Sequence, residues 1–118
     1  ILVVDDEPDI RELVRDILED ENYSVTTAED AATAREALRE RRPDLILLDI
    51  MLPIIDGFEV CQRVRENPEW NDIRIILLTA MGSEANIAKG LALGADAYIT
   101  KPFSNSEVIA KVKELICQ

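Results

Sequence analysis

The sequence has no histidine among its 118 residues. A chain without imidazole has no histidine general base, cannot build a His-containing zinc site and cannot carry a phosphohistidine. Any histidine chemistry in which it takes part must therefore be supplied by a partner.

Cysteines and long apolar runs are also scarce. The two cysteines, Cys61 and Cys117, lie far apart and outside any C-x-x-C spacing, which argues against a disulfide framework or a zinc knuckle and predicts reduced thiols. No apolar run approaches the roughly 18 residues that a membrane span needs, and the opening residues lack the charged segment of a signal peptide. We therefore expect a cytoplasmic protein without a membrane segment. Because the sequence opens on Ile1 inside an apolar run, we also expect it to be a domain of a longer protein.

Basic residues are outnumbered by acidic ones. The chain has 13 Lys and Arg against 24 Asp and Glu, a net charge of -11. This balance argues against nucleic acid or an anionic membrane as a direct ligand, because affinity for both comes largely from Lys and Arg, but it is compatible with binding a cation. The length and the 47% hydrophobic content fit one domain over residues 1–118, with a core that needs no disulfides.

Short apolar runs alternate with stretches of helical period. Several of these runs are apolar at every residue, as expected for strands of a sheet that is covered on both faces. The predicted strands are residues 1–4, 24–28, 45–48, 74–78 and 96–99.

Capping signals delimit the helices between these strands. Asp30 is the expected N-cap of the second helix, and Ser104 with Glu107 forms a capping box for the last. Gly94 is the expected C-cap of the fourth helix, which we place at residues 83–93. Five strand–helix units predict a doubly wound α/β fold, with a five-stranded parallel sheet of flavodoxin-like order 2-1-3-4-5 and helices on both faces.

In such a sheet, ligands bind beyond the carboxyl ends of the strands. Asp5 and Asp6 follow the first predicted strand, Asp49 the third and Thr79 the fourth, while the fifth runs into Lys101. Because these four strands are neighbours in the predicted order, we expect their side chains to converge on one cleft.

Three aspartates in one cleft need compensation for their charge. Two carboxylates about 4 Å apart repel by several kcal/mol at an effective dielectric constant of about 20. A divalent cation together with Lys101 would supply that compensation, and a few oxygen ligands without histidine or thiolate favour Mg²⁺. Since a carboxylate can attack phosphorus, the leading hypothesis is phosphoryl transfer onto Asp49, with Thr79 donating a hydrogen bond to the transferred group.

Each of these residues also has an ordinary interpretation. The acidic run Asp5–Asp9 would complement the dipole of the following helix, Asp49 and Thr79 would be common strand-end residues, and Lys101 with Pro102 would be a plain turn. Acidic and basic residues in complementary places at four of the five strand ends favour the functional interpretation.

Five segments, in their order and spacing, resemble the receiver domain of two-component response regulators over the whole chain. They are ILVVDDEP at 1–8, DIMLPIIDG at 49–57, LTA at 78–80, GADAY at 94–98 and KPF at 101–103. The resemblance implies a phospho-accepting regulatory domain of phosphorelay signal transduction, whose only chemistry is its own phosphorylation and dephosphorylation, and not an enzyme.

The resemblance also implies roles for the acidic residues. Asp49 matches the phosphorylated aspartate. Asp6 and Asp49 would ligate Mg²⁺ directly, Met51 would add its backbone carbonyl, and Asp5 would act largely through a metal-bound water.

Three further residues match the phosphoryl-binding and switch positions of the family. Lys101 would ion-pair with the phosphoryl group, and the hydroxyl of Thr79 would move toward it. Tyr98 matches the aromatic residue that turns inward when that hydroxyl shifts, although periodicity alone favours a half-buried strand aromatic at this position.

Two more matches are structural. The peptide bond between Lys101 and Pro102 is cis in the family, and we expect it to be cis here. Gly57 is expected to serve the backbone turn into the third helix, with Asp56 as the N-cap.

The implied partner is a sensor histidine kinase or a histidine phosphotransfer protein, with small phosphodonors as a second source. An output domain outside the sequence and a phosphorylation-dependent dimer are also compatible with the family. Its dimerising transcription-factor branch often has an acid where this chain has Ala97, able to pair with a base such as Lys111, so that mode of dimerisation is not expected here.

Three alternative functions fit the sequence less well. A flavodoxin-like electron carrier needs a Ser/Thr/Gly-rich phosphate loop and aromatics that sandwich a flavin, whereas the loop is acidic here and aromatics make up 4%. An aspartyl phosphatase usually carries Asp-x-Asp where this chain has adjacent Asp5 and Asp6. A receiver-like protein-interaction module without phosphorylation would be expected to have lost reactive groups, and every one of them is retained.

Overall fold

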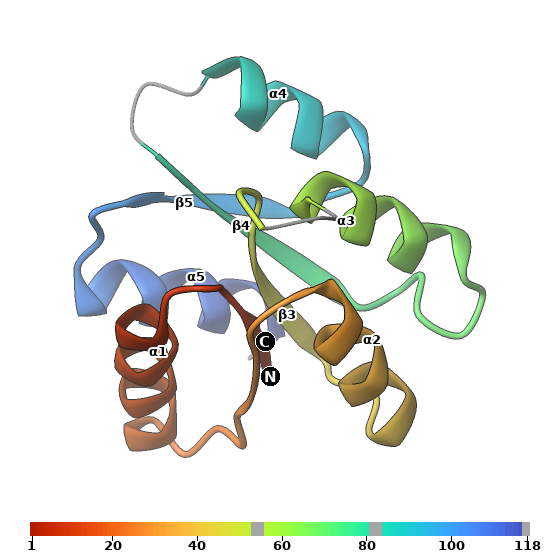
Figure 1. The fold of residues 1–118 in the computed structure, drawn as a ribbon. Coiled ribbons are helices and arrows are strands. Elements are labelled where there is room, and N and C mark those ends of the chain that lie inside the picture. The colour runs from red at the N-terminus through yellow and green to blue at the C-terminus, as the bar shows by residue number, and fades with distance from the viewer. Residues whose placement is uncertain (53–55, 81–83, 117–118) are drawn as a thin grey trace.

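The computed structural model describes residues 1–52, 56–80 and 84–116, in which strands and helices alternate along the chain (Figure 1). The strands are β1 (Leu2–Val4), β2 (Thr26–Ala28), β3 (Leu45–Asp49), β4 (Arg74–Ala80) and β5 (Ala97–Lys101). The helices are α1 (Pro8–Asp20), α2 (Ala31–Glu40), α3 (Gly57–Glu66), α4 (Glu84–Ala92) and α5 (Asn105–Ile116).

The strands form one parallel sheet in the order β2-β1-β3-β4-β5, which confirms the predicted topology. Val4 at the end of β1 lies opposite Leu48, and Asp49 at the end of β3 lies opposite Leu78. The carboxyl ends of β1, β3 and β4 are therefore side by side, and the residues that follow β1 are brought level with the end of β3.

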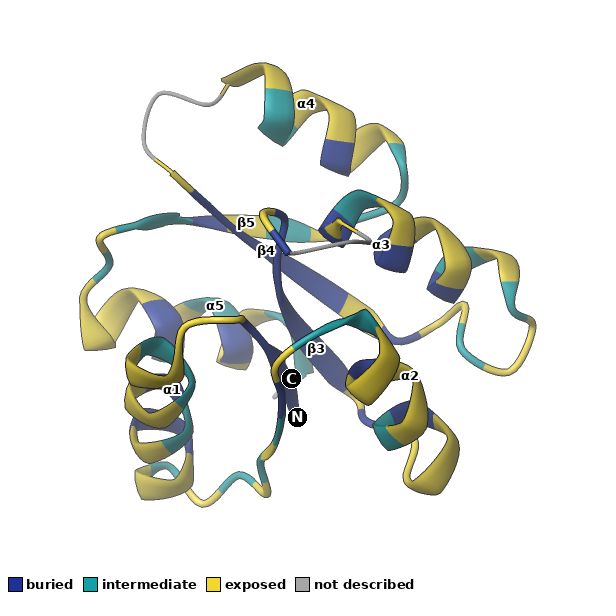
Figure 2. Cartoon of the chain, viewed as in Figure 1, coloured by how far each residue is buried: buried dark blue, intermediate teal, exposed yellow. Residues whose placement is uncertain are grey.

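Helices cover both faces of the sheet, and each face has its own apolar core. On one face α2 and α3 pack against the sheet and α4 lies beside α3 over β4, while α1 and α5 cover the other face (Figure 1). The central strands are consequently buried between two layers of helices (Figure 2). This explains why β3 is apolar from Leu45 to Leu48 without alternation, since both sets of side chains are covered.

Capping residues hold the helix ends as the sequence predicts. Asp30, Asp56 and Ser104 each accept a hydrogen bond from the backbone N–H three residues later, at 2.8, 3.0 and 3.2 Å. Gly94 follows α4 with a φ of 109°, a backbone conformation that favours glycine. The predicted first residue of α4, Ser83, lies outside the described residues.

The bounds of β2, β4 and β5 differ from the predicted ones by one or two residues. Strand β2 starts at Thr26 and not at residue 24, since its ladder with β1 begins at the pair Leu2 and Thr26. Strands β4 and β5 run two residues further than expected, because Thr79 and Thr100 still lie opposite one another in the ladder. Lys101 therefore projects from the last residue of a strand.

The chain has two cysteines, Cys61 and Cys117. Cys61 is a buried free thiol, in keeping with the reduced state predicted for it, and Cys117 lies outside the described residues. Burial raises the pKa of the Cys61 thiol.

Among the helices that the structure describes, none combines the length and apolar character that a membrane crossing requires.

Candidate functional site

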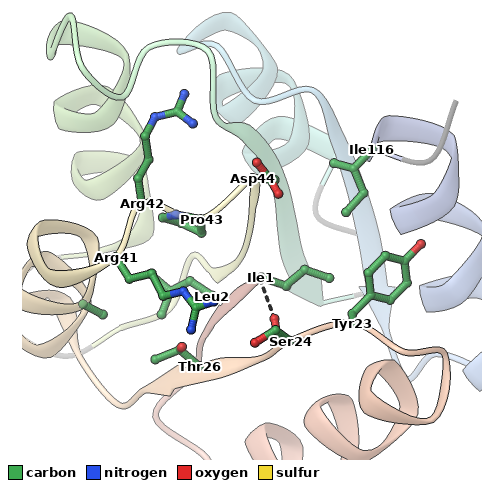
Figure 3. Close-up of a pocket in the computed structure, with 11 residues that line it drawn as sticks. Ile1, Leu2, Tyr23, Ser24, Thr26, Arg41, Arg42, Pro43, Asp44 and Ile116 are labelled. Atoms are coloured by element: carbon green, nitrogen blue, oxygen red, sulfur yellow. Dashed lines mark hydrogen bonds between the residues drawn. The ribbon is translucent and has the colours of Figure 1, made fainter.

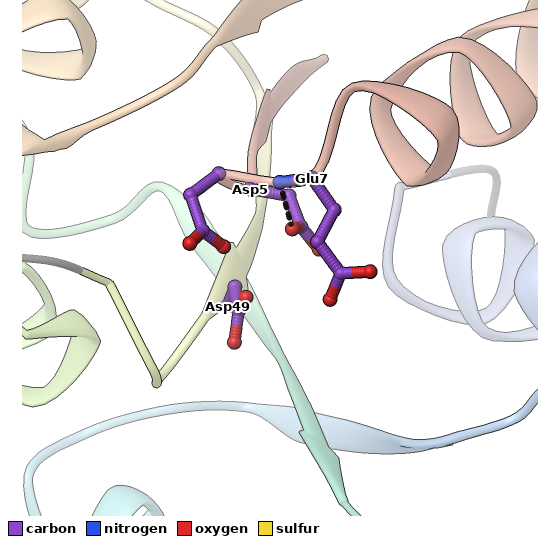
Figure 4. A group of neighbouring side chains, drawn as sticks. Asp5, Glu7 and Asp49 are labelled. Atoms are coloured by element: carbon purple, nitrogen blue, oxygen red, sulfur yellow. Dashed lines mark hydrogen bonds between the residues drawn. The ribbon is translucent and has the colours of Figure 1, made fainter.

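Four carboxylates gather where β1 and β3 end. Asp5, Asp6, Glu7 and Asp49 each offer an oxygen that lies within 4.8 Å of the others; Figure 4 labels three of them. Asp5 is fully buried and Asp49 is 4% exposed, whereas Asp6 and Glu7 are exposed. The cluster therefore has a buried base and a solvent-facing rim.

Glu7 is the member of this cluster that the sequence analysis did not select. It follows Asp5 and Asp6 directly and precedes Pro8, the first residue of α1. The signal for Glu7 was its place directly after Asp5 and Asp6 in the acidic run at residues 5–9.

Local hydrogen bonds fix the position of Asp5. Its carboxylate accepts from the backbone N–H of Glu7 at 2.9 Å (Figure 4), and its carbonyl accepts from Nη1 of Arg11 at 2.7 Å. Its own N–H donates to the carbonyl of Ala28 at the end of β2, at 3.1 Å. The chain can turn directly from β1 into α1 because these bonds satisfy the backbone at the turn.

Asp49 is held at the carboxyl end of the central strand β3. Its Oδ1 accepts from the backbone N–H of Met51 at 2.9 Å, and Met51 itself is exposed. A Cβ on Gly57 would lie 2.4 Å from the carbonyl oxygen of Asp49 and 2.6 Å from Cα of Ile50. The structure thus gives a steric reason for Gly57: the start of α3 packs directly against the strand end that carries Asp49.

Lys101 reaches into the cluster from β5. Its Nζ lies 2.9 Å from Oδ2 of Asp5, 3.4 Å from Oδ2 of Asp49 and 3.6 Å from Oε1 of Glu7. Burial alone would lower the pKa of Lys101, but hydrogen bonds and charges from Asp5 and Asp49 outweigh it, and the net effect is a raised pKa. Lys101 is therefore an ammonium at neutral pH. Its peptide bond to Pro102 is cis, as the resemblance predicts.

One ammonium does not balance the four carboxylates. The pKa of Asp49 is raised, chiefly because burial disfavours its charged form and also because Asp5 is close, while the Met51 N–H and Lys101 oppose the shift. Four oxygen donors with an excess of negative charge suit a hard divalent cation such as Mg²⁺. The donor set thus fits the magnesium predicted from the sequence, and an acidic cluster of this kind is typical of a receiver-domain magnesium site.

Thr79 and Tyr98 lie on the two strands beyond Asp49. Thr79, one residue past the partner of Asp49 in the ladder, is 2% exposed, and its hydroxyl donates a long 3.5 Å hydrogen bond to the carbonyl of Ala80. Tyr98 on β5 is 41% exposed. In this structure the Thr79 side chain is thus buried, whereas the Tyr98 ring lies at the surface.

A small pocket lies at the other end of the sheet. It has a volume of about 160 Å³ and is lined by residues around the amino end of β1, among them Ile1, Tyr23, Arg41 and Asp44 (Figure 3). No member of the acidic cluster lines it. The candidate site is therefore defined by its charges at the carboxyl ends of the strands and not by this hollow.

Comparisons with known proteins agree with this geometry. The family model described as response regulator receiver domain matches residues 1–113. Among curated relatives, the phosphate regulon transcriptional regulatory protein PhoB of Rhizobium meliloti is 46% identical and the transcriptional regulatory protein ResD of Bacillus subtilis is 50% identical. Both alignments cover 98% of this chain but only 51% and 47% of the relatives, so the chain spans about half their length.

Solved structures give the same result. A putative response regulator from Chloroflexus aurantiacus superposes with a TM-score of 0.95 at 32% identity, covering 99% of this chain and 96% of that one. The receiver domain of NtrX from Brucella abortus gives a TM-score of 0.92 at 32% identity, with 99% and 98% covered. The chain belongs to the response regulator receiver domain family, and it is a regulatory domain and not a classical enzyme.

Proposed function

We propose that the domain formed by residues 1–118 is a phosphorelay switch in which Asp49 accepts a phosphoryl group. The observation that carries the proposal is the position of this carboxylate. It is almost fully buried at the end of the central strand, beside three acids that could hold a cation with it, and the ammonium of Lys101 lies 3.4 Å away.

The transfer reaction needs a donor from outside the chain, because the chain has no histidine. A carboxylate oxygen of Asp49 attacks phosphorus, and a new P–O bond forms. The P–N bond of a partner's phosphohistidine breaks, or the P–O bond of a small acyl phosphate, and its electron pair leaves with the donor. Lys101 Nζ, 3.4 Å from Oδ2 of Asp49, would pair with the phosphoryl oxygens.

The residues proposed to hold Mg²⁺ are Asp6 and Asp49 directly, Met51 through its backbone carbonyl, and Asp5 largely through water. When bound, the ion would neutralise charge on the phosphoryl oxygens. Asp5 also accepts the 2.9 Å bond from Lys101 and so orients the ammonium toward Asp49.

The switch is proposed to operate through Thr79 and Tyr98. The hydroxyl of Thr79 would exchange its long 3.5 Å bond for one to the phosphoryl group, and Tyr98 is exposed enough for its ring to turn inward. The response would be a shift between two populated states that changes the surface of α4, β5 and α5.

The proposed partner is a sensor histidine kinase or a histidine phosphotransfer protein. Since the chain spans about half of its curated relatives, an output domain outside these residues is part of the proposal, as is a phosphorylation-dependent dimer.

The test is phosphorylation by acetyl phosphate with and without Mg²⁺, followed by intact-mass analysis. We expect one Mg²⁺-dependent phosphoryl adduct on the wild type and on Asp16→Asn, whose side chain is 71% exposed on α1, and none on Asp49→Asn. An undiminished adduct on Asp49→Asn, or no adduct on the wild type, would overturn the proposal.

A further inference from the structure

A groove with a volume of about 960 Å³ runs between α2 and α3. This volume is at the upper end of the range for ligand sites in proteins, about 300–1,000 Å³. None of the four carboxylates of the acidic cluster lines it. The groove is therefore a feature of the domain that the proposed phosphoryl chemistry does not use.

The floor of the groove is apolar. Leu38 from α2 and Val60 and Val64 from α3 line it and are buried, with exposed fractions of 3%, 7% and 1%. At one end lies Trp70, the only tryptophan of the chain, which is partly buried and packs against the core. Partly exposed tryptophans beside apolar grooves are frequent anchor points for partner proteins.

The rim of the groove is basic. Arg35 and Arg39 are four residues apart on α2, so they share one face of that helix, and Arg63 lines the groove from α3. Within the described residues, Arg35 and Arg39 make no hydrogen bond or ion pair, whereas Arg63 is 3.1 Å from Glu59. Unpaired guanidinium groups are available to an incoming anion.

The charge of the groove contrasts with that of the chain. Three arginines and two acids, Glu36 and Glu69, line it, and because Arg63 is paired with Glu59, the positive charge available to an occupant is that of Arg35 and Arg39. The chain as a whole has 24 acids and 13 bases. An occupant matched to the groove therefore needs negative charge beside an apolar surface.

We propose that the groove between α2 and α3 binds an acidic amphipathic helix of a partner protein. Its apolar face would lie on Ala31, Ala32 and Trp70, which keep exposed surface above the buried floor, and its acidic side would pair with Arg35 and Arg39. Each wall is a ten-residue helix about 15 Å long, which matches a partner helix of about three turns. Nucleic acid fits less well, because the chain's net charge of -11 repels a long polyanion.

The test uses the emission of Trp70 and two synthetic twelve-residue helical peptides. Both have a leucine face, and the opposite face carries glutamate in one peptide and lysine in the other. We expect saturable binding and a blue shift of Trp70 emission with the glutamate peptide alone. Arg35→Gln combined with Arg39→Gln should weaken this binding by roughly 5-fold, because each surface ion pair contributes up to about 1 kcal/mol.

The matched control is Arg15→Gln, an exposed arginine on α1 at the opposite face of the sheet. It should leave the peptide affinity unchanged, and the double variant should leave the acetyl phosphate adduct unchanged, which separates this proposal from the proposed phosphorylation. Equal binding of the lysine peptide would overturn the proposal, as would an unchanged affinity of the double variant. Tighter, competitive binding of ATP at the same arginines would also overturn it, in favour of a nucleotide.

Discussion

Removing the negative charge of Asp49 is expected to stabilise the metal-free protein. Its carboxylate is almost fully buried and lies within 4.8 Å of the buried carboxylate of Asp5, while Lys101 is shared between the two. Asparagine keeps the shape of the side chain and the oxygen that accepts the hydrogen bond from Met51 but removes the charge. Asp49→Asn therefore removes the charge of this carboxylate together with the 3.4 Å hydrogen bond that Oδ2 accepts from Lys101.

Repulsion from Asp5, attraction by Lys101 and desolvation decide how far Asp49→Asn changes the free energy of unfolding. At an effective dielectric constant of about 20, repulsion from Asp5, whose oxygen lies within 4.8 Å, costs at least roughly 3.5 kcal/mol. Attraction by Lys101 at 3.4 Å contributes roughly 5 kcal/mol in the other direction. Desolvation of a buried ion costs several kcal/mol more, and burial is the largest cause of the raised pKa of Asp49. The balance is a stabilisation of about 1–2 kcal/mol for Asp49→Asn.

The pH dependence has a definite sign. Because the pKa of Asp49 is raised above its ordinary value of 3.8, the folded protein retains a proton that the unfolded chain has lost between the two pKa values. Stability of the metal-free wild type should consequently fall as pH rises through that window, and this component should be missing in Asp49→Asn.

Urea unfolding in EDTA, followed by circular dichroism, measures the effect. At pH 7.5 we expect a higher midpoint for Asp49→Asn with an unchanged m-value, while Asp16→Asn on the surface of α1 should change stability by less than about 0.5 kcal/mol. Mg²⁺ at ten times its dissociation constant should add about 1.4 kcal/mol to the wild type and less to Asp49→Asn. A loss of stability in Asp49→Asn under EDTA would refute the electrostatic reasoning.

Three further predictions use the same unfolding assay. Gly57→Ala should lower the free energy of unfolding by about 2 kcal/mol or more, because its Cβ would meet the backbone at the end of β3; a neutral or stabilising result would contradict this contact. The raised pKa of Lys101 contributes stability that is present below its ordinary value of 10.5 and is lost as pH rises through the raised value, so Lys101→Met should lose this alkaline limb. Arg65→Lys should cost about 1–3 kcal/mol, because the guanidinium donates to three backbone carbonyls and to the Asp96 carboxylate; an unchanged midpoint would show that one ammonium can replace this fork.

The sheet order and the place of Asp5, Asp49 and Lys101 could be predicted because they depend on patterns that the chain carries locally. Apolar runs such as Leu45–Leu48 identify buried strands, and alternation with helices limits the order of the sheet. Parallel strands bring their carboxyl ends together, so Asp5, Asp49 and Lys101 could be placed at one edge before any coordinates were known. Their distances of 2.9 and 3.4 Å are consistent with that placement.

Contacts between distant segments could not be predicted in the same way. The close approach of Gly57 to Asp49 depends on how far α3 sinks toward the sheet, which no local pattern records. Arg65 resembles any exposed arginine on the polar face of a helix, yet its guanidinium reaches the carbonyl of Gly94 and the carboxylate of Asp96. Such contacts depend on the packing of whole elements, and only the folded structure supplies it.

The electrostatic imbalance at the strand ends links stability to the proposed switch. Lys101 contacts three of the four clustered acids, so no single carboxylate has an ammonium to itself. Phosphorylation of Asp49 would replace a single negative charge by a group with nearly two, so a cation and Lys101 would each interact more strongly in the phosphorylated state than before it. A ligand shifts a conformational equilibrium only through its different affinity for the two states. A site with an excess of negative charge before phosphorylation can therefore bind a cation with different affinity in the two states. A neutral site in which every charge is paired would respond little to the same phosphoryl group.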